Sequence, residues 1–353
     1  MTPVRRPQAP LLSVVLPVGG VEQYLPACLD SVLDQPEPAA GIEVIAVDDA
    51  SPDSCGAILA DRARQDPRLR VIHLPERAGP GPARMRGLAE AAGAYVWFVD
   101  PDDLLTDGCL TRVAARLAHD QPDVLLLDYL ILHPSGQTEP SPGAELLAGA
   151  APVLTFADRP ALIERTMTSW SKVFRRPFLA SLGVAFPPGI HEDIPVSCAA
   201  LLSAGRISLL HQVCYLYRRR GGSFLATASM DHFSIFSSYE QVFALLDAAP
   251  RWQGQPAVTP AVRAAVFGRA IEHYSTVLAN GLVPRHARRA FFGRMTRDFH
   301  RYRPPCYQRP PGLRGLKIAL VERGAYGAYM ILGPLNGARV ALRRALAAVP
   351  RAR

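Results

Sequence analysis

The sequence predicts an α/β fold in which helices flank a Rossmann-like, mostly parallel sheet, followed by a helical and basic C-terminal region. Three observations predict it. Continuous apolar runs, typical of strands buried on both faces of a sheet, alternate with segments of helical spacing between Leu11 and Leu132. Two of these runs end directly in groups of aspartates. Beyond about residue 230 the apolar pattern is helical and basic residues accumulate.

The predicted elements of the sheet follow one another as strand, helix and strand. The expected strands are 11–16, 42–47, 69–74, 94–99, 123–132 and 206–217. The expected helices between the first five strands are 21–35, 53–64, 83–92 and 107–119. In the first of them, Leu25, Leu29 and Val32 recur at the spacing of one helical face. This alternation predicts a parallel, doubly wound sheet, because parallel neighbours need crossover connections.

The remainder of the chain is less regular. Residues 133–152 are rich in Pro, Gly and Ser and predict a surface loop. Residues 158–204 are expected to be helical with interruptions. The helices expected in the C-terminal region are 233–246, 261–278 and 285–299, followed by a proline-rich break at 303–311 and further basic helices.

The net charge of +8 is concentrated at one end of the chain. Residues 285–353 contain 16 basic and 2 acidic residues, a net charge of +14, whereas the other residues have a net charge of −6. Such a block suits an anionic membrane surface or a phosphorylated acceptor, and an ordinary solvated helical face is the alternative. No nucleic-acid-binding motif accompanies it, so we expect no nucleic-acid partner.

Cysteine usage predicts a cytoplasmic protein. The six cysteines form no CxxC pair and no zinc-ligand spacing, as is typical of reduced thiols. Residues 1–10 are polar and proline-rich, unlike a signal peptide. The uncharged stretch 324–338 is too short to span a membrane and is expected to be a packed helix, with peripheral contact at the inner membrane face as the alternative.

The two groups of aspartates are the main functional signal. Asp48-Asp49 follows one predicted strand, and Asp100-Pro101-Asp102-Asp103 follows another. In open α/β sheets, ligands bind beyond the carboxyl ends of the strands. Clustered carboxylates repel one another unless a cation is present, and oxygen ligands suit Mg²⁺ or Mn²⁺, which usually also bind substrate phosphates. The sequence therefore predicts a site for a metal-bound diphosphate, most simply that of a nucleotide-activated donor.

Several segments, in this order, resemble family 2 of the glycosyltransferases, which are inverting enzymes of the GT-A fold. The resemblance covers roughly residues 11–225. The segments are LSVVLP (12–17), VEQYL (21–25), VDDASPD (47–53), GPAR (81–84), FVDPDD (98–103), WSKVFRR (170–176), FPPGIHED (186–193) and YLYR (215–218) with Ser223 after it. Residues 155–245 also resemble the glycosyltransferase portion of actinobacterial glycosyltransferase/glycerophosphotransferase fusions.

The resemblance implies a transfer of sugar from a nucleotide sugar to an acceptor hydroxyl. It implies that Mn²⁺ or Mg²⁺ binds Asp102, with Asp100 as a partner ligand and Asp103 as an alternative, and stabilises the leaving diphosphate. A helix N-cap at Asp102 or Asp103 is the alternative interpretation. Domains are expected at 1–230, with a nucleotide-binding half at 11–133 and an acceptor-side half at 153–230, and at 231–353, a basic helical extension.

The resemblance also assigns residues to the donor. Asp49 is implied to contact the base and to favour uracil, hence a UDP-sugar, although a turn cap is the alternative. The other implied donor contacts are Pro17, Arg84, Asp100, Arg218, Arg220 and Ser223. Arginine forks match phosphate oxygens, so Arg218 and Arg220 are expected to clamp the diphosphate.

On the acceptor side, the resemblance implies that Asp193 is the general base, with Glu192 as the less favoured choice. A helix N-terminus enriched in acids is the alternative for this pair. Trp170, Lys172 and His191 are expected to line the acceptor side, and core packing is an equal alternative for Trp170. The acceptor can be a polysaccharide, a lipid-linked carrier or a small natural product.

Two departures from the family pattern concern the donor. Gly19-Gly20 replaces the usual Tyr-Asn after the first strand, which removes an aromatic face near the base, and Met85 replaces an Asn. A non-catalytic, transferase-like docking protein at the membrane or in a biosynthetic assembly is therefore the alternative function. A nucleotidyltransferase is disfavoured, because Val18–Glu22 contains no basic residue.

Overall fold

The computed structural model describes residues 9–141, 144–146, 153–165, 168–220, 227–248 and 258–332. The chain divides into two compact units. The first comprises residues 1–223 and 238–258, and the second comprises residues 224–237 and 259–353. The sheet and its helices belong to the first unit.

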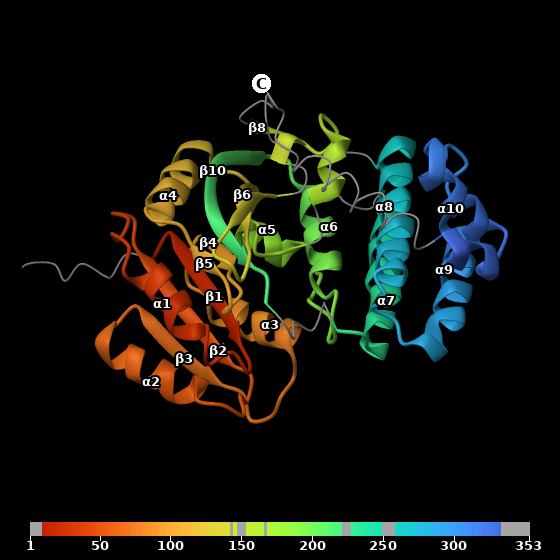
Figure 1. Cartoon of the computed structure of the whole chain (residues 1–353). Coiled ribbons are helices and arrows are strands. Elements are labelled where there is room, and N and C mark those ends of the chain that lie inside the picture. The colour runs from red at the N-terminus through yellow and green to blue at the C-terminus, as the bar shows by residue number, and fades with distance from the viewer. Residues whose placement is uncertain are drawn as a thin grey trace, which may run out of the picture. The chain divides into compact units, whose positions relative to one another are not determined.

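The sheet of the first unit confirms the expected α/β class (Figure 1). Its strand order is β3-β2-β1-β4-β9-β6-β10-β5, with β7 beside β6 and β8 beside β10. The strands are β1 (Leu12–Val18), β2 (Ile42–Asp48), β3 (Leu69–His73), β4 (Tyr95–Phe98), β5 (Leu104–Leu105), β6 (Val124–Leu132), β7 (Thr138–Pro140), β8 (Val153–Leu154), β9 (Lys172–Arg175) and β10 (Ile207–Arg218). The first four of the order are parallel, and β6 and β10 are parallel to each other.

Helices cover both faces of the sheet, as a sheet buried on both faces requires. The helices are α1 (Leu25–Leu33), α2 (Cys55–Gln65), α3 (Pro80–Glu90), α4 (Cys109–Asp120), α5 (Arg176–Ser181) and α6 (Asp193–Ser203). Leu12, Val14 and Leu16 of β1 share one core with buried residues of α1, α2 and α4. Val15 points to the opposite face, where α3 approaches so closely that a Cβ on Gly87 would lie 2.3 Å from Val15 Cγ1.

Strand β9 is the main departure from the prediction, which placed interrupted helix over 158–204. It lies between β4 and β6 and is antiparallel to both. The strand has only four residues and begins and ends with a basic side chain, so its sequence shows no apolar run. Because both pairings of β9 are antiparallel, β4 and β6 run in the same direction. The carboxyl ends of β1, β2, β4, β6 and β10 therefore share one edge of the sheet.

The second unit is helical in its described residues. It contains α8 (Pro260–Ala279), α9 (Arg288–Tyr302) and α10 (Gly312–Glu322), as well as the start of α7 (Ser234–Ala248). An aromatic cluster holds it together: Phe236 lies 4.6 Å from both Tyr274 and Phe291, measured between ring centroids. Within the described ranges, no helix combines the length and the apolar composition needed to cross a membrane.

Candidate active site

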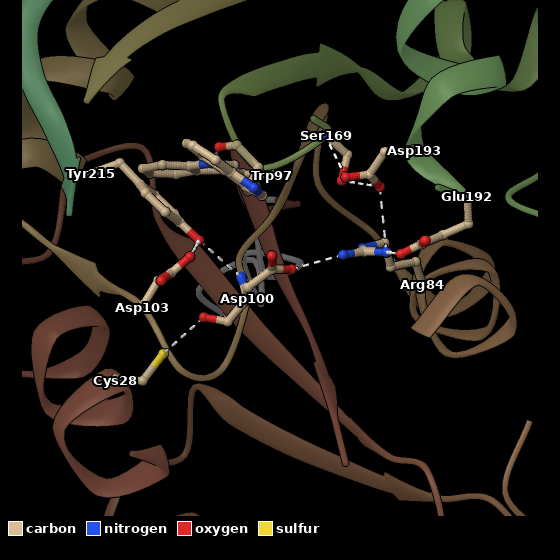
Figure 2. Close-up of polar contacts among 10 residues, drawn as sticks. Cys28, Arg84, Trp97, Asp100, Asp103, Ser169, Glu192, Asp193 and Tyr215 are labelled. Atoms are coloured by element: carbon tan, nitrogen blue, oxygen red, sulfur yellow. Dashed lines mark hydrogen bonds and ion pairs between the residues drawn. The ribbon is translucent and has the colours of Figure 1, made fainter. Parts of the chain in front are cut away.

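A buried arginine at this edge of the sheet joins Asp100, which follows β4, to Glu192 and Asp193 at the start of α6. Arg84 lies on α3 with an exposed fraction of 3%. Its Nη2 donates to Asp100 Oδ1 at 2.7 Å, and its Nη1 lies 2.5 Å from Glu192 Oε1 and 3.3 Å from Asp193 Oδ1 (Figure 2). The family resemblance assigns Arg84 to the donor. The structure places its guanidinium among three carboxylates, where it connects the end of β4 to the start of α6.

One guanidinium does not compensate three carboxylates. Burial raises the pKa of Asp100 to about 6, although the charge of Arg84 opposes this shift. Burial likewise raises the pKa of Glu192 to about 7, against the opposing effect of Arg84. Burial disfavours the charge of Arg84 itself, but Asp193, Asp100 and Glu192 outweigh it and raise the pKa of Arg84 well above its ordinary value. The cluster therefore favours an additional positive charge or a proton.

Residues 100–103 form an acidic turn after β4, and Asp103 anchors this turn to β10. Its side chain is 1% exposed, its Oδ2 accepts from the Tyr215 hydroxyl at 2.6 Å, and its Oδ1 accepts from the Arg218 backbone N–H at 2.7 Å. The Tyr215 hydroxyl also accepts from the Asp100 backbone N–H at 3.1 Å. Burial raises the pKa of Asp103 well above its ordinary value. Both oxygens of this alternative metal ligand are thus already engaged in holding the turn.

Asp102 lies beside the two arginines expected to clamp the diphosphate. Arg220 Nε donates to Asp102 Oδ2 at 2.5 Å, and Arg218 Nε donates to the Asp102 carbonyl at 2.8 Å. Both guanidinium carbons lie 5.4 Å from the centre of the Tyr24 ring, which sequence reasoning did not assign to the site. Ser223 lies outside the described residues.

The acidic turn fits a divalent cation that is completed by phosphate. Asp100 Oδ2 and Asp102 Oδ1 accept no hydrogen bond from the described part of the chain. Within that part, no three His, Cys, Asp or Glu side chains converge as a complete metal site. Mg²⁺ is typically held by one or two carboxylates together with substrate phosphates rather than by a protein cage, and Asp100 and Asp102 provide this type of donor set.

The proposed base is held by a residue that sequence reasoning missed. Asp193 is the first residue of α6, where the helix dipole favours a negative charge. Its Oδ1 accepts from Ser169 Oγ at 2.8 Å, and its Oδ2 accepts from the Ser169 backbone N–H at 3.0 Å. The available signal was position, because Ser169 directly precedes the WSKVFRR segment.

The residues expected on the acceptor side are mostly interior. Trp170 is 4% exposed and stacks on Tyr215, so the structure favours the core-packing alternative. Lys172 has no exposed surface, and its ammonium donates to the Thr168 carbonyl and to Ser171 Oγ. His191 is partly exposed with a left-handed backbone (φ 66°) directly before Glu192.

Two residues expected to contact the donor, Pro17 and Asp49, are also buried. Pro17 lies inside β1. Asp49 is 4% exposed, and its two carboxylate oxygens accept from the backbone N–H groups of Ala78 and Gly79 at 2.7 and 2.8 Å. In this arrangement Asp49 fixes the segment that leads into α3. A Cβ on Gly19 would lie 3.8 Å from the Cβ of Asp49, which is an ordinary contact distance. The aromatic side chain that the family usually has at this position would therefore start beside Asp49.

The fold is that of GT-A transferases. The structure resembles the crystal structure of S. aureus TarS 1–349 in complex with UDP-GlcNAc, with a TM-score of 0.73 and 22% sequence identity, over 92% of this chain and 90% of that chain. Residues 13–131 match the model of glycosyl transferase family 2.

Curated relatives agree with this assignment. The chain is 30% identical to the uncharacterized glycosyltransferase EpsJ of Bacillus subtilis, over 61% of this chain and 62% of EpsJ. It is also 30% identical to the succinoglycan biosynthesis protein ExoO of Rhizobium meliloti, over 57% of this chain and 59% of ExoO. A third relative at 30% identity is the poly(ribitol-phosphate) beta-N-acetylglucosaminyltransferase TarS of Staphylococcus aureus, over 61% of this chain and 37% of TarS. The chain thus spans less than two thirds of the length of these relatives.

Proposed function

We propose that this protein is a metal-dependent, inverting glycosyltransferase that moves a sugar from a nucleotide sugar, most simply a UDP-sugar, to an acceptor hydroxyl. The observation that carries the proposal is the position of Arg84. Its side chain contacts Asp100 of the acidic turn as well as Glu192 and Asp193. The relatives named for succinoglycan and poly(ribitol-phosphate) favour a polymer as the acceptor.

In this proposal Asp193 takes the proton from the acceptor hydroxyl. Inversion requires a base on the face of the sugar opposite the leaving group. Asp193 suits this role because Ser169 and Arg84 hold its carboxylate, and it retains 13% side-chain exposure. Glu192 is less suited, because its carboxylate lies closer to Arg84 Nη1, at 2.5 Å against 3.3 Å for Asp193, and is therefore engaged more strongly by the guanidinium.

On the donor side, Asp102 and Asp100 would hold Mn²⁺ or Mg²⁺, which when bound supplies Lewis-acid stabilisation of the leaving diphosphate. Arg218 and Arg220 contribute donors that match phosphate oxygens. Arg220 contacts Asp102 in the present arrangement, so we propose that it exchanges this carboxylate for the diphosphate when the donor binds.

The direct test is calorimetric binding of UDP, GDP, CDP and TDP, each with and without Mn²⁺. We expect selective, Mn²⁺-dependent binding of UDP that is lost in Asp102→Ala. Preference for another nucleotide would redirect the donor assignment to the space beside Gly19. Metal-independent binding, or full Mn²⁺-dependent binding by Asp102→Ala, would refute the metal site.

The base assignment has its own test. Asp193→Asn should retain UDP binding but release UDP from the donor more slowly by a factor of about 10² to 10⁴, the usual contribution of general-base catalysis. Near-normal turnover of this variant would exclude Asp193 as the base.

A peripheral contact with an anionic membrane is a second proposal, which concerns the second unit alone. Arg289, Arg297 and Arg301 of α9 are exposed. None of the three forms an ion pair within the described ranges, whereas Arg303 and Arg309 pair with Glu322. The unpaired arginines of α9 give this unit a surface that complements anionic lipid headgroups.

A further inference from the structure

Ser169 makes two hydrogen bonds to a single carboxylate. Its side chain has no exposed surface. The hydroxyl donates to one oxygen of Asp193 at 2.8 Å, and the backbone N–H donates to the other oxygen at 3.0 Å (Figure 2). Two donors on two oxygens fix both the position of the carboxylate and its rotation about the Cβ–Cγ bond.

The backbone of Ser169 is held in turn by its neighbour Trp170. The Trp170 ring stacks on Tyr215 at 4.5 Å with an interplanar angle of 13°, and on Tyr217 at 5.4 Å with an angle of 6°. Its carbonyl accepts from Trp97 Nε1 of β4 at 2.7 Å. Close-packed aromatic contacts of this kind allow little displacement, so the N–H and hydroxyl of Ser169 have a defined direction.

The same stack leads to the acidic turn. Tyr215, which packs on Trp170, donates its hydroxyl to Asp103 and accepts from the Asp100 backbone N–H. Asp193 is therefore connected to the turn by two separate routes. One is the ionic contact through Arg84, and the other is the packed route through Ser169, Trp170 and Tyr215.

We propose that Ser169 is a positioning residue for the reaction: it orients the Asp193 carboxylate toward the acceptor hydroxyl, while Trp170 fixes Ser169 relative to the acidic turn. The inference rests on the proposed role of Asp193 as the base. Preorganisation of this kind matters because a displacement of about 1 Å at the reacting groups can cost about 10²-fold in rate.

The kinetic test compares Ser169→Ala with Ser171→Ala. Ser171 is 3% exposed, lies in the same segment, and directs its hydroxyl to Thr168 and Lys172 rather than to Asp193, so it controls for loss of a buried hydroxyl. The assay is Mn²⁺-dependent release of UDP from UDP-GlcNAc with water as the acceptor. We expect Ser169→Ala to lower kcat by about 10- to 100-fold, the usual effect of removing a partner that orients a functional ligand. Its KM and UDP affinity should stay unchanged, and Ser171→Ala should keep the parent kcat.

A double-mutant cycle separates positioning from general destabilisation. In the Asp193→Asn background, adding Ser169→Ala should cause no further loss of kcat. An additive loss there, or equal kcat values for Ser169→Ala and Ser171→Ala, would overturn the inference. If Asp193→Asn itself is fully active, the proposed base fails first, and the positioning role fails with it. An inactive Asp193→Asn combined with a fully active Ser169→Ala would refute the positioning role alone.

A structural measurement applies even if hydrolysis is too slow to follow. In crystals of Ser169→Ala, we expect the Asp193 carboxylate to rotate or to occupy more than one orientation, and in Ser171→Ala to keep its single orientation. An unchanged carboxylate in Ser169→Ala would contradict the proposal.

Discussion

At the scale of single residues, Asp102 faces a competition between two cations. Its Oδ2 accepts from Arg220, and the same carboxylate is the proposed ligand of the divalent ion. Arg220 therefore neutralises Asp102 in the absence of donor. Arg220 engages only one of the two carboxylate oxygens of Asp102, so the other oxygen stays available to the divalent ion. How strongly the two cations compete therefore depends on where the Arg220 side chain lies.

Replacing Arg220 should separate its effect on metal binding from its effect on nucleotide binding. We expect Arg220→Ala to bind Mn²⁺ more tightly in the absence of nucleotide, because the carboxylate loses its competing partner, and to bind UDP with Mn²⁺ more weakly. Isothermal titration of Mn²⁺ alone and of UDP measures both. Arg219→Ala is the matched control, since Arg219 is exposed and removes the same charge from the same segment. Equal Mn²⁺ affinity in the two variants would contradict the competition.

Glu192 predicts a pH dependence of stability. Its pKa is raised from 4.5 to about 7, mainly by burial, so the folded protein holds this proton more tightly than the unfolded chain does. The resulting stabilisation is fully present below about pH 4.5 and is lost as pH rises through about 7.

Glu192→Gln removes this titration. The Tm of the parent protein should therefore fall relative to that of Glu192→Gln as the pH is raised from 5 to 8. Thermal melts of both proteins across this range measure the difference. A parent protein that gains stability relative to the variant with rising pH would show that Arg84 outweighs burial at this carboxylate.

At the scale of elements, α3 is positioned by glycines that allow close approach. A Cβ on Gly81 would lie 2.4 Å from the Pro187 carbonyl oxygen, so any larger residue must push the first turn of α3 away from the segment that leads to Glu192. Arg84 lies one turn further along the same helix and depends on that spacing.

We expect Gly81→Ala to destabilise the protein by about 1–3 kcal/mol, as overpacking usually does. It should also slow UDP release, because the displaced α3 carries Arg84 away from its partners. Gly293→Ala is the control, because Gly293 lies inside α9 with no atom within 4 Å of its added Cβ. It should stabilise by about 0.4–1 kcal/mol. Thermal and urea unfolding measure both changes. A neutral Gly81→Ala would show that α3 can move without cost.

The elements show which signals in the sequence were sufficient. The apolar runs predicted β1, β2, β3, β4, β6 and β10, and the helices between the first five of these strands, to within a few residues. The signal is strongest for β1, β2 and β4, which are buried on both faces, whereas β3 at the edge of the sheet is only partly buried. β9 was missed, since its burial arises from its neighbours β4 and β6 rather than from its own four residues. Boundaries at α3 also shifted, because Pro80 begins the helix three residues earlier than expected.

The candidate site was predictable in part for the same reason. Strand ends placed Asp49, Asp100 and Asp102 at one edge from sequence alone. The contacts of Arg84 with Glu192 and of Ser169 with Asp193 were not predicted, because the partners are 108 and 24 residues apart and no local pattern in the sequence indicates the contact. The contact of Tyr24 with two arginines was not predicted either, because it depends on the path of the chain at the end of β10.

At the scale of the whole molecule, charge is divided between the parts of the chain. The carboxylates of the site belong to the first unit, and the exposed arginines of α9 belong to the second. The family match at 13–131 lies entirely within the first unit, so the second unit carries features that the family model does not account for.

Vesicle binding tests the role of these arginines. The full chain should bind phosphatidylglycerol vesicles more tightly than phosphatidylcholine vesicles, and less tightly at high salt. Replacing Arg289, Arg297 and Arg301 by Ser should weaken binding by about 10²-fold, at about 1 kcal/mol for each arginine near the surface. The control replaces Arg303, Arg309 and Arg314, which form ion pairs with Glu322 or Glu272. Equal binding to both kinds of vesicle would exclude the contact.

The sharing of Arg84 also has a consequence for the order of events. Its positive charge is divided among Asp100, Glu192 and Asp193, so any cation that arrives at Asp100 leaves more of that charge for the other two. Cation occupancy at Asp100 and protonation of Glu192, whose pKa burial raises to about 7, are then thermodynamically linked, and each must influence the other by the same free energy. A bound cation would favour the ionised form of Glu192, so that the start of α6 carries more negative charge once the acidic end of β4 is occupied.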